Sequence, residues 1–145
     1  MKNLTSPKRI FLLEAPLEIL HAESLEWLEE VEFWKDEAAF FYALIMEKTK
    51  QNPSAFKAKE SKDVEKHLVY VSAEKIDDLK MEVQAHERFL ARLMDNPKLD
   101  EQLYRSRHQT IAEKIKRFEF EFKQMKQKVF AVAEKASGRK KAMST

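Results

Sequence analysis

Two histidines, His86 and His108, have the residue type and the spacing to act together inside the protein. Each lies on the apolar face of a predicted helix, and Asn96-Pro97 makes a tight connection between the two helices. Pairing residues outward from this connection places His86 opposite His108 in one layer of the core. Facing imidazoles in a helical bundle either hydrogen-bond to one another, which fixes the helix register, or bind a transition metal.

The first predicted helix would add a further side chain to this layer. Its candidates at that level are His21, Ser24, Glu26 and Glu30. A ferritin-like di-iron site needs two Glu-x-x-His motifs, whereas this chain has that spacing only from Glu18 to His21. We therefore predict a hydrogen-bonded polar layer without a cofactor. A layer that binds a transition metal is the alternative.

Three glutamates, Glu23, Glu30 and Glu37, recur every seven residues beside the tryptophans of the first predicted helix. Two carboxylates on adjacent turns could serve as general acid and general base. Carboxylates that flank an apolar stripe more often pair with cations of a neighbouring helix. The cations expected to pair with them are Arg105, Arg107 and Lys114. The chain has neither a glycine-rich phosphate loop nor a nucleophile beside a base, so we expect no enzymatic activity.

Long amphipathic helices must position these side chains, and the clearest of them runs from Tyr104 to Ala136. No proline or glycine interrupts it, and its apolar residues recur at alternating steps of four and three. The stripe consists of Tyr104, His108, Ile111, Ile115, Phe118, Phe122, Met125, Val129, Val132 and Ala136. Such a stripe must be covered by other helices.

Two further helices have the same spacing. The stripe of the first is Leu20, Ser24, Trp27, Val31, Trp34, Ala38, Phe41 and Ile45, and that of the second is Val69, Ser72, Ile76, Leu79, Val83, His86, Leu90 and Leu93. The helices are expected over about 16–51, 58–95 and 98–137. Short connections make sequential helices antiparallel. The predicted fold class is therefore all-α, an up-down-up bundle of three long helices that dimerisation would complete.

The composition is that of a helical protein without disulfides. The 145 residues include one glycine, four prolines, no cysteine and 36% charged side chains, whereas a sheet protein needs more turn residues. The apolar run 10–13 is too short for a signal-peptide core or a membrane span, so we expect no membrane association and a cytoplasmic location. We predict an N-terminal lead-in over 1–15, one domain over 16–138 and a disordered basic tail over 139–145.

Charge is segregated along the chain although the formal net charge is only +2. Residues 14–37 carry nine acidic side chains against one lysine, and residues 105–141 carry twelve basic ones against four acidic ones. We expect the acidic first helix and the basic third helix to attract one another. The alternative is an anionic partner at a basic face formed by Lys116, Lys123, Lys126 and Lys128. Nucleic acid is not expected, because no reading motif is present.

Several large apolar side chains fall outside the stripes. Phe33, Phe40 and Leu44 lie about 120° around the first helix from its tryptophan face, where they either widen the core or form an exposed surface. Phe120 points away from the stripe of the third helix. Exposed aromatic side chains on long helices favour association with another helix. We therefore predict a non-enzymatic interaction or scaffolding protein that forms a homodimer or binds a partner helix. A metal-binding bundle and an anion-binding protein are the alternatives.

Overall fold

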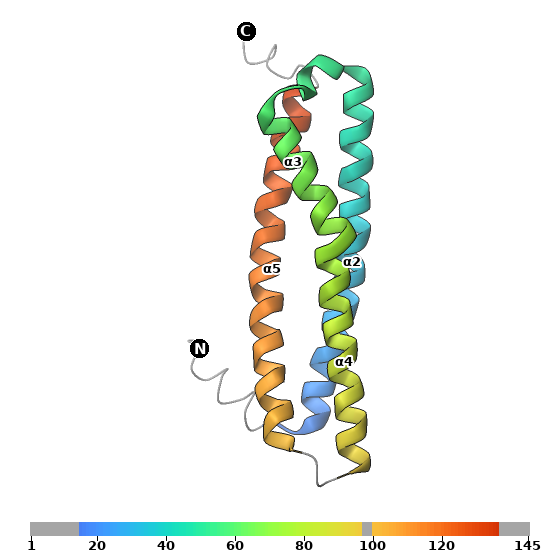
Figure 1. Cartoon of the computed structure of the whole chain (residues 1–145), viewed down its shortest axis with the longest axis vertical. Helices are drawn as coiled ribbons and strands as arrows, with labels where there is room; N and C mark the ends of the chain where they lie inside the picture. The colour runs from blue at the N-terminus through green and yellow to red at the C-terminus, as the bar shows by residue number, and fades with distance from the viewer. Residues whose placement is uncertain (1–14, 97–99, 137–145) are drawn as a thin grey trace. The chain divides into compact units, whose positions relative to one another are not determined.

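A computed structural model describes residues 15–96 and 100–136 of the chain. In order, it contains α2 (Leu17–Gln51), the 3-10 helix η1 (Pro53–Phe56), α3 (Lys59–Tyr70), the π-helical turn η2 (Val71–Lys75), α4 (Ile76–Asp95) and α5 (Glu101–Ala136) (Figure 1). The described residues contain no strand, so the all-α fold class is confirmed. None of the described helices combines the length and the apolar content that crossing a membrane requires.

The observed helices follow the predicted ones closely. The helix predicted over 16–51 is α2, the one predicted over 58–95 is the continuous run from α3 through η2 to α4, and the one predicted over 98–137 is α5. Three predicted features lie outside the described residues. They are the end positions 98 and 137 of that last helix, most of the lead-in over 1–15, and the basic tail over 139–145.

The start and the end of α2 have identifiable causes. The carbonyl of Pro16 accepts the backbone N–H groups of Ile19 and Leu20, and the guanidinium of Arg105 donates to the carbonyl of Ala15 at 2.6 Å. At the other end, Pro53 disfavours a helical conformation for the residue before it. The chain then forms η1, whose Phe56 is buried.

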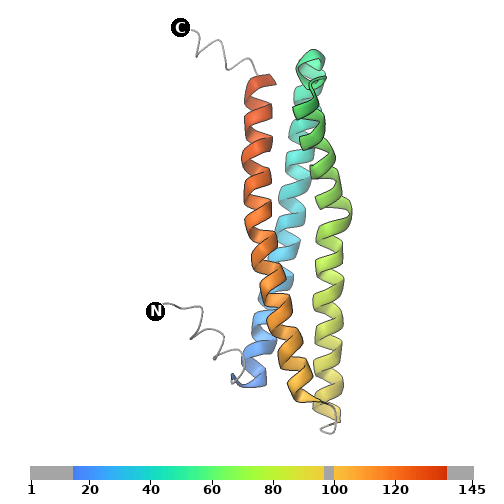
Figure 2. The same ribbon diagram turned by 60° about the vertical axis from the view of Figure 1, so that its left-hand side comes forward.

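The turn η2 changes which residues of the second predicted helix are buried. The N–H of Ile76 bonds to the carbonyl of Val71, five residues back, so one extra residue enters the helix at this point. The core positions up to the first residue of the turn are therefore Val64, Leu68 and Val71, and the predicted core residue Val69 is 43% exposed. Figure 2 shows η2 within an uninterrupted ribbon between α3 and α4. The predicted stripe is wrong before the turn because it assumed one helical period throughout.

The predicted stripes of the first and third helices are confirmed, because every residue in both stripes is buried. In the second helix the predicted residues from Ile76 onward, beginning where the π-helical turn ends, are also buried. Burial of a stripe on each helix is what holds such long helices in a fold, since isolated helices in water are only marginally stable.

Contacts divide the chain into two compact units, which are described separately. The first unit lies within Met1–Glu32 and Asp78–Phe118, and the second lies within Phe33–Asp77 and Glu119–Thr145. Each unit draws on residues of three helical segments. The single domain over 16–138 stays a prediction.

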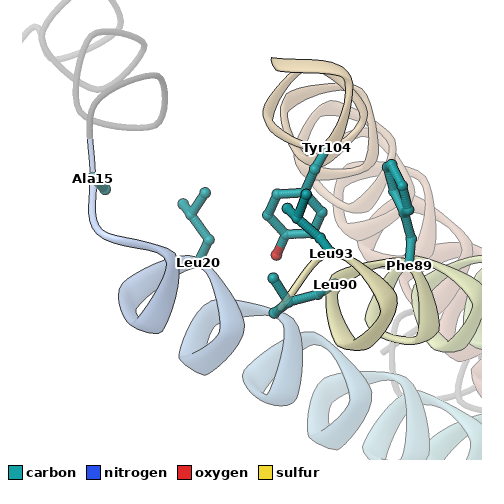
Figure 3. Close-up of a cluster of buried hydrophobic side chains, with 6 residues drawn as sticks. All are labelled: Ala15, Leu20, Phe89, Leu90, Leu93 and Tyr104. Atoms are coloured by element: carbon teal, nitrogen blue, oxygen red, sulfur yellow. The ribbon is translucent and has the colours of Figure 1, made fainter. Parts of the chain in front are cut away.

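The core of the first unit contains a hydrophobic cluster contributed by three helices. Figure 3 shows Tyr104 of α5 between Leu20 of α2 and the leucines Leu90 and Leu93 of α4, with Phe89 beside it. The ring centroids of Phe89 and Tyr104 are 6.0 Å apart in an edge-on arrangement. This cluster lies next in sequence to the histidines, because Tyr104 and Leu90 are one helical turn from His108 and His86.

The core of the second unit is aromatic. Phe122 of α5 lies with its ring centroid 6.2 Å from that of Trp34 and 6.4 Å from that of Phe41, both on α2. The ion pairs between helical segments of this unit include Lys75 with Glu121 at 3.1 Å and Lys135 with Glu60 at 3.3 Å. The side-chain amide of Asn52 donates to the carbonyl of Ala136.

Candidate functional site

His86 and His108 meet in the core of the first unit. Nε2 of His86 lies 2.9 Å from Nδ1 of His108, and the two residues are only 4% and 0% exposed. Their positions follow from the helical period, because His86 is three residues from Val83 and four from Leu90, while His108 is four from Tyr104 and three from Ile111. The two histidines therefore occupy positions within two apolar stripes, where polar side chains replace apolar ones.

Helix α2 supplies a carboxylate and an aromatic ring to His108. Oε1 of Glu23 lies 2.8 Å from Nε2 of His108, and the indole of Trp27 stacks on the imidazole with centroids 4.5 Å apart. Glu23 and Trp27 are four residues apart, so they lie on the same face of α2. The layer is thus a chain of three groups that runs from Glu23 through His108 to His86.

The order of the groups determines the proton positions when the imidazoles are neutral. The carboxylate of Glu23 accepts a hydrogen bond, so Nε2 of His108 carries the proton and Nδ1 of His108 is an acceptor. Nε2 of His86 must then donate to that atom. Nδ1 of His86 is left as a buried acceptor, and it has no hydrogen-bond partner among the described residues. This assignment makes the layer directional, with the carboxylate at one end and an unprotonated nitrogen at the other.

The surroundings of His86 disfavour its charged form. The ring of Tyr104 stacks on it in parallel, with centroids 4.3 Å apart. Burial, followed by repulsion from His108 and from Arg107, lowers the pKa of His86 to about 4. Burial also raises the pKa of Tyr104 above its usual value, with a smaller contribution from the carboxylate of Glu87. The two stacked rings are therefore both neutral near pH 7.

Two of the other side chains predicted for the layer, His21 and Glu30, are exposed. Nδ1 of His21 lies 2.5 Å from Oε1 of Glu87, and the His21 side chain is 48% exposed. Glu30 is exposed, whereas Ser24 is fully buried. The carboxylate that joins the histidines is Glu23, which sequence reasoning had assigned to a cation. The sequence does not show how the connection after α2 is folded, so residues cannot be counted across it with certainty. Spacing alone therefore gave a range of α2 residues that could lie level with the two histidines.

The described part of the chain contains no group of three or more histidine, aspartate and glutamate side chains arranged to hold a metal ion. In the layer itself, the nitrogens that face one another are already joined by a hydrogen bond. The geometry therefore fits a hydrogen-bond network that fixes the register of three helical segments.

Two of the three glutamates, Glu23 and Glu37, have partners other than the expected cations. Lys114 pairs with Glu82 at 2.9 Å, and Arg105 pairs with Glu101 at 2.9 Å. Glu37 pairs with Lys126 at 3.4 Å. Contacts between the acidic α2 and the basic α5 thus include Glu23 with His108 in the first unit and Glu37 with Lys126 in the second.

The predicted interaction surface lies entirely in the second unit. Phe33, Phe40 and Phe120 are 62%, 60% and 61% exposed, and Leu44 is half-buried. The alternative in which Phe33 and Phe40 widen the core is therefore wrong. Sequence reasoning missed Phe130, which is 51% exposed and packs edge-on against Phe41 with centroids 5.3 Å apart. The sequence did indicate this exposure, because Phe130 follows the stripe residue Val129 and therefore lies outside the stripe of the third helix.

Two open hollows border this surface between α2 and α5. One of about 340 Å³ is lined by Asp36, Glu37, Phe40, Phe41, Lys126 and Phe130. The other, of about 730 Å³, is lined by Phe40, Leu44, Lys48, Gln127, Phe130, Ala131, Ala133 and Glu134. Phe40 and Phe130 line both, so the two hollows form one apolar surface with charged residues at its edges.

The basic face predicted on the third helix is divided by its contacts. Lys126 is half-buried, paired with Glu37 and placed 5.7 Å from the centroid of Phe122. Lys116, Lys123 and Lys128 are exposed, and none of them forms an ion pair with another described residue. Three exposed lysines along one helix are typical of a solvated surface. No family model matches the chain, and no curated protein or solved structure matches it either.

Proposed function

We propose that this protein is a non-enzymatic interaction module whose helices form an up-down-up bundle and which associates with a second copy through the second unit. The observation that carries the proposal is the exposed aromatic surface at Phe40 and Phe130, and two further phenylalanines of the same unit, Phe33 and Phe120, are also more than half exposed. Scattered single apolar residues are normal on a protein surface. Here Phe40 and Phe130 line the same two hollows, and such continuous apolar surface favours binding of another protein.

The kind of partner follows from the shape of the surface. Phe40 and Leu44 are one turn apart on α2, and Phe130 and Glu134 are one turn apart on α5, so the open surface runs along two helices. A groove between helices is filled best by another helix, which presents side chains at the same spacing. In a homodimer, a helix of the second copy would cover it.

Absolute mass in solution tests the proposal. We would measure the molar mass of the whole chain by size-exclusion chromatography with light scattering, at concentrations from micromolar to millimolar. Self-association that weakens in Phe40→Ala and in Phe130→Ala would support the proposal. The matched control is Tyr42→Ala, which removes an aromatic side chain that is 40% exposed on the same helix and lines neither hollow.

Two results would contradict self-association. The chain could remain a monomer at every concentration, which would leave a different helical protein as the partner of this surface. It could also dimerise equally well after Phe40→Ala and Phe130→Ala, which would place the interface elsewhere. Neither the metal-binding alternative nor the anion-binding alternative has a contact in the described residues that favours it over this surface.

A further inference from the structure

One stripe of α2 within the second unit has a charge at each end and apolar residues between them. It consists of Asp36, Phe40, Leu44 and Lys48, which are spaced by four residues. Asp36 and Phe40 are exposed, and Leu44 and Lys48 are half-buried. Residues at this spacing form a continuous ridge on a helix. The order along the ridge is therefore acid, apolar, apolar, base.

The two end charges have no ion-pair partner among the described residues. Neighbouring charges on α2 do have partners, since Lys35 pairs with Asp77 at 3.2 Å and Glu37 pairs with Lys126 at 3.4 Å. Asp36 and Lys48 also line the two hollows, Asp36 at the one and Lys48 at the other. The apolar surface is thus bordered by one unpaired negative and one unpaired positive charge.

This order is self-complementary only when two copies run in opposite directions. We propose that the second copy packs its α2 antiparallel on this ridge about a two-fold axis, an inference that rests on the self-association proposed above. Asp36 then faces Lys48 of the second copy, and Phe40 faces Leu44 of the second copy. The two-fold axis repeats both contacts, because each surface patch in such an interface meets its own copy.

A parallel arrangement in register has the opposite electrostatic consequence. It would place Asp36 against Asp36 and Lys48 against Lys48, and like charges facing one another across an interface suppress that pairing. The antiparallel register also brings Glu37 toward Glu47 of the second copy. That contact is moderated by interactions within each chain, because Glu37 is paired with Lys126 and Glu47 accepts a hydrogen bond from Gln51 at 3.2 Å.

Helix α5 extends the same interface. Phe130 lies beside Phe40 at both hollows, so a helix seated on the ridge would cover the exposed parts of both rings. Aromatic side chains at the centre of an interface with charges around them are the usual arrangement of residues that dominate binding. The phenylalanines therefore supply affinity, and the end charges select the direction of the second chain.

The absence of cysteine from the chain allows a direct test of direction. We would prepare Asp36→Cys and Lys48→Cys separately, mix them, and treat the mixture and each variant alone with a short thiol-to-thiol cross-linker. In the proposed register, the thiol at position 36 of one chain faces the thiol at position 48 of the other. Two thiols at position 36 are instead about 18 Å apart along the helix axis. The mixed dimer also keeps one intact Asp36 to Lys48 pair on the other side of the two-fold axis.

We expect cross-linked dimer in the mixture and little in either variant alone. The matched control is Ala39→Cys mixed with Lys48→Cys, because residue 39 is exposed on α2 but lies off the ridge. Cross-linking of Asp36→Cys with itself would show parallel packing or an antiparallel register centred near residue 36, and either result overturns this inference and leaves self-association standing. A dimer that cross-links in no combination would place the interface elsewhere and also overturn it. A monomer at every concentration would remove both proposals.

Charge exchange gives a second, independent measurement. Asp36→Lys should weaken dimerisation about tenfold, because it places two positive charges at each end of the interface. The double variant Asp36→Lys with Lys48→Asp restores opposite charges in the antiparallel register, and its dimerisation constant should return to within about threefold of the original value. Failure of the double variant to recover would overturn the proposed register.

Discussion

His86 and His108 share a hydrogen bond of 2.9 Å in the core of the first unit, and Glu23 lies 2.8 Å from the other side of His108. Both histidines are buried among aromatic rings. The layer therefore joins three helical segments by hydrogen bonds. Its energetics can be tested without knowledge of any partner.

Stability should fall as the pH is lowered below about 6.5, the ordinary pKa of histidine. The pKa of His86 in the folded protein is about 4, so between these values the unfolded chain binds a proton that the folded protein does not. This group lowers the free energy of unfolding by up to about 3 kcal/mol at pH 4 and contributes nothing above pH 7. Urea unfolding at a series of pH values measures the effect.

The part of this pH dependence that belongs to His86 should disappear in His86→Gln, whose amide can still donate to His108. The control is His67→Gln, because His67 is exposed on α3 and should leave the pH profile unchanged. If wild-type protein and His86→Gln lose stability equally between pH 7 and pH 4, burial of a neutral His86 is not the cause.

Removing the carboxylate of Glu23 should destabilise the protein although this side chain is partly exposed. Glu23→Ala leaves Nε2 of the fully buried His108 without its partner, which costs about 1–3 kcal/mol. Glu23→Gln should cost less, since an amide oxygen can accept the same bond. Chemical unfolding at pH 7.5 measures both variants.

The control for Glu23 is Glu29→Ala on the exposed face of the same helix, for which we expect a change within about 0.5 kcal/mol. An equal loss of stability in Glu23→Ala and Glu29→Ala would mean that the bond to His108 contributes nothing measurable.

Two phenylalanines of α5 should respond differently. Phe122→Ala removes a ring that is 2% exposed and packs near Trp34 and Phe41, so it should cost about 3–5 kcal/mol. Phe120→Ala removes a ring that is 61% exposed and lines neither hollow, so the protein should keep its stability. Thermal unfolding at fixed concentration measures both variants. An equal loss of stability in Phe122→Ala and Phe120→Ala would contradict the assignment of these two faces.

Chelation should leave the protein unchanged. We expect less than about a tenth of an equivalent of any transition metal after incubation with zinc, nickel or iron and removal of the excess, because a site for such a metal needs three or four ligands. The melting temperature should also be the same with and without EDTA. Close to one equivalent of metal, together with a melting temperature that EDTA lowers, would restore the metal-binding alternative.

The sequence alone was sufficient to identify the helices and most of the buried residues. A stripe such as that from Tyr104 to Ala136 is an internal property of one helix, because the helical period decides which side chains share a face. The exposed position of Phe120 follows from the same period, whereas the period left Phe33 and Phe40 open between a wider core and an exposed surface, and the structure shows both to be exposed. The pairing of His86 with His108 could also be predicted, since the connection at Pro97 is short enough for residues to be counted across it.

Tertiary structure decided what depends on contacts between helices. The turn η2 moved the core from Val69 to Val71, because a helix can take in an extra residue when packing compensates for the altered hydrogen bonds. The partner of His108 became Glu23 instead of His21 or Glu30, because the register of α2 depends on the path through η1, where no period applies. Sequence periodicity determines the faces of each helix, whereas the contacts between faces also depend on how the connections set one helix against another.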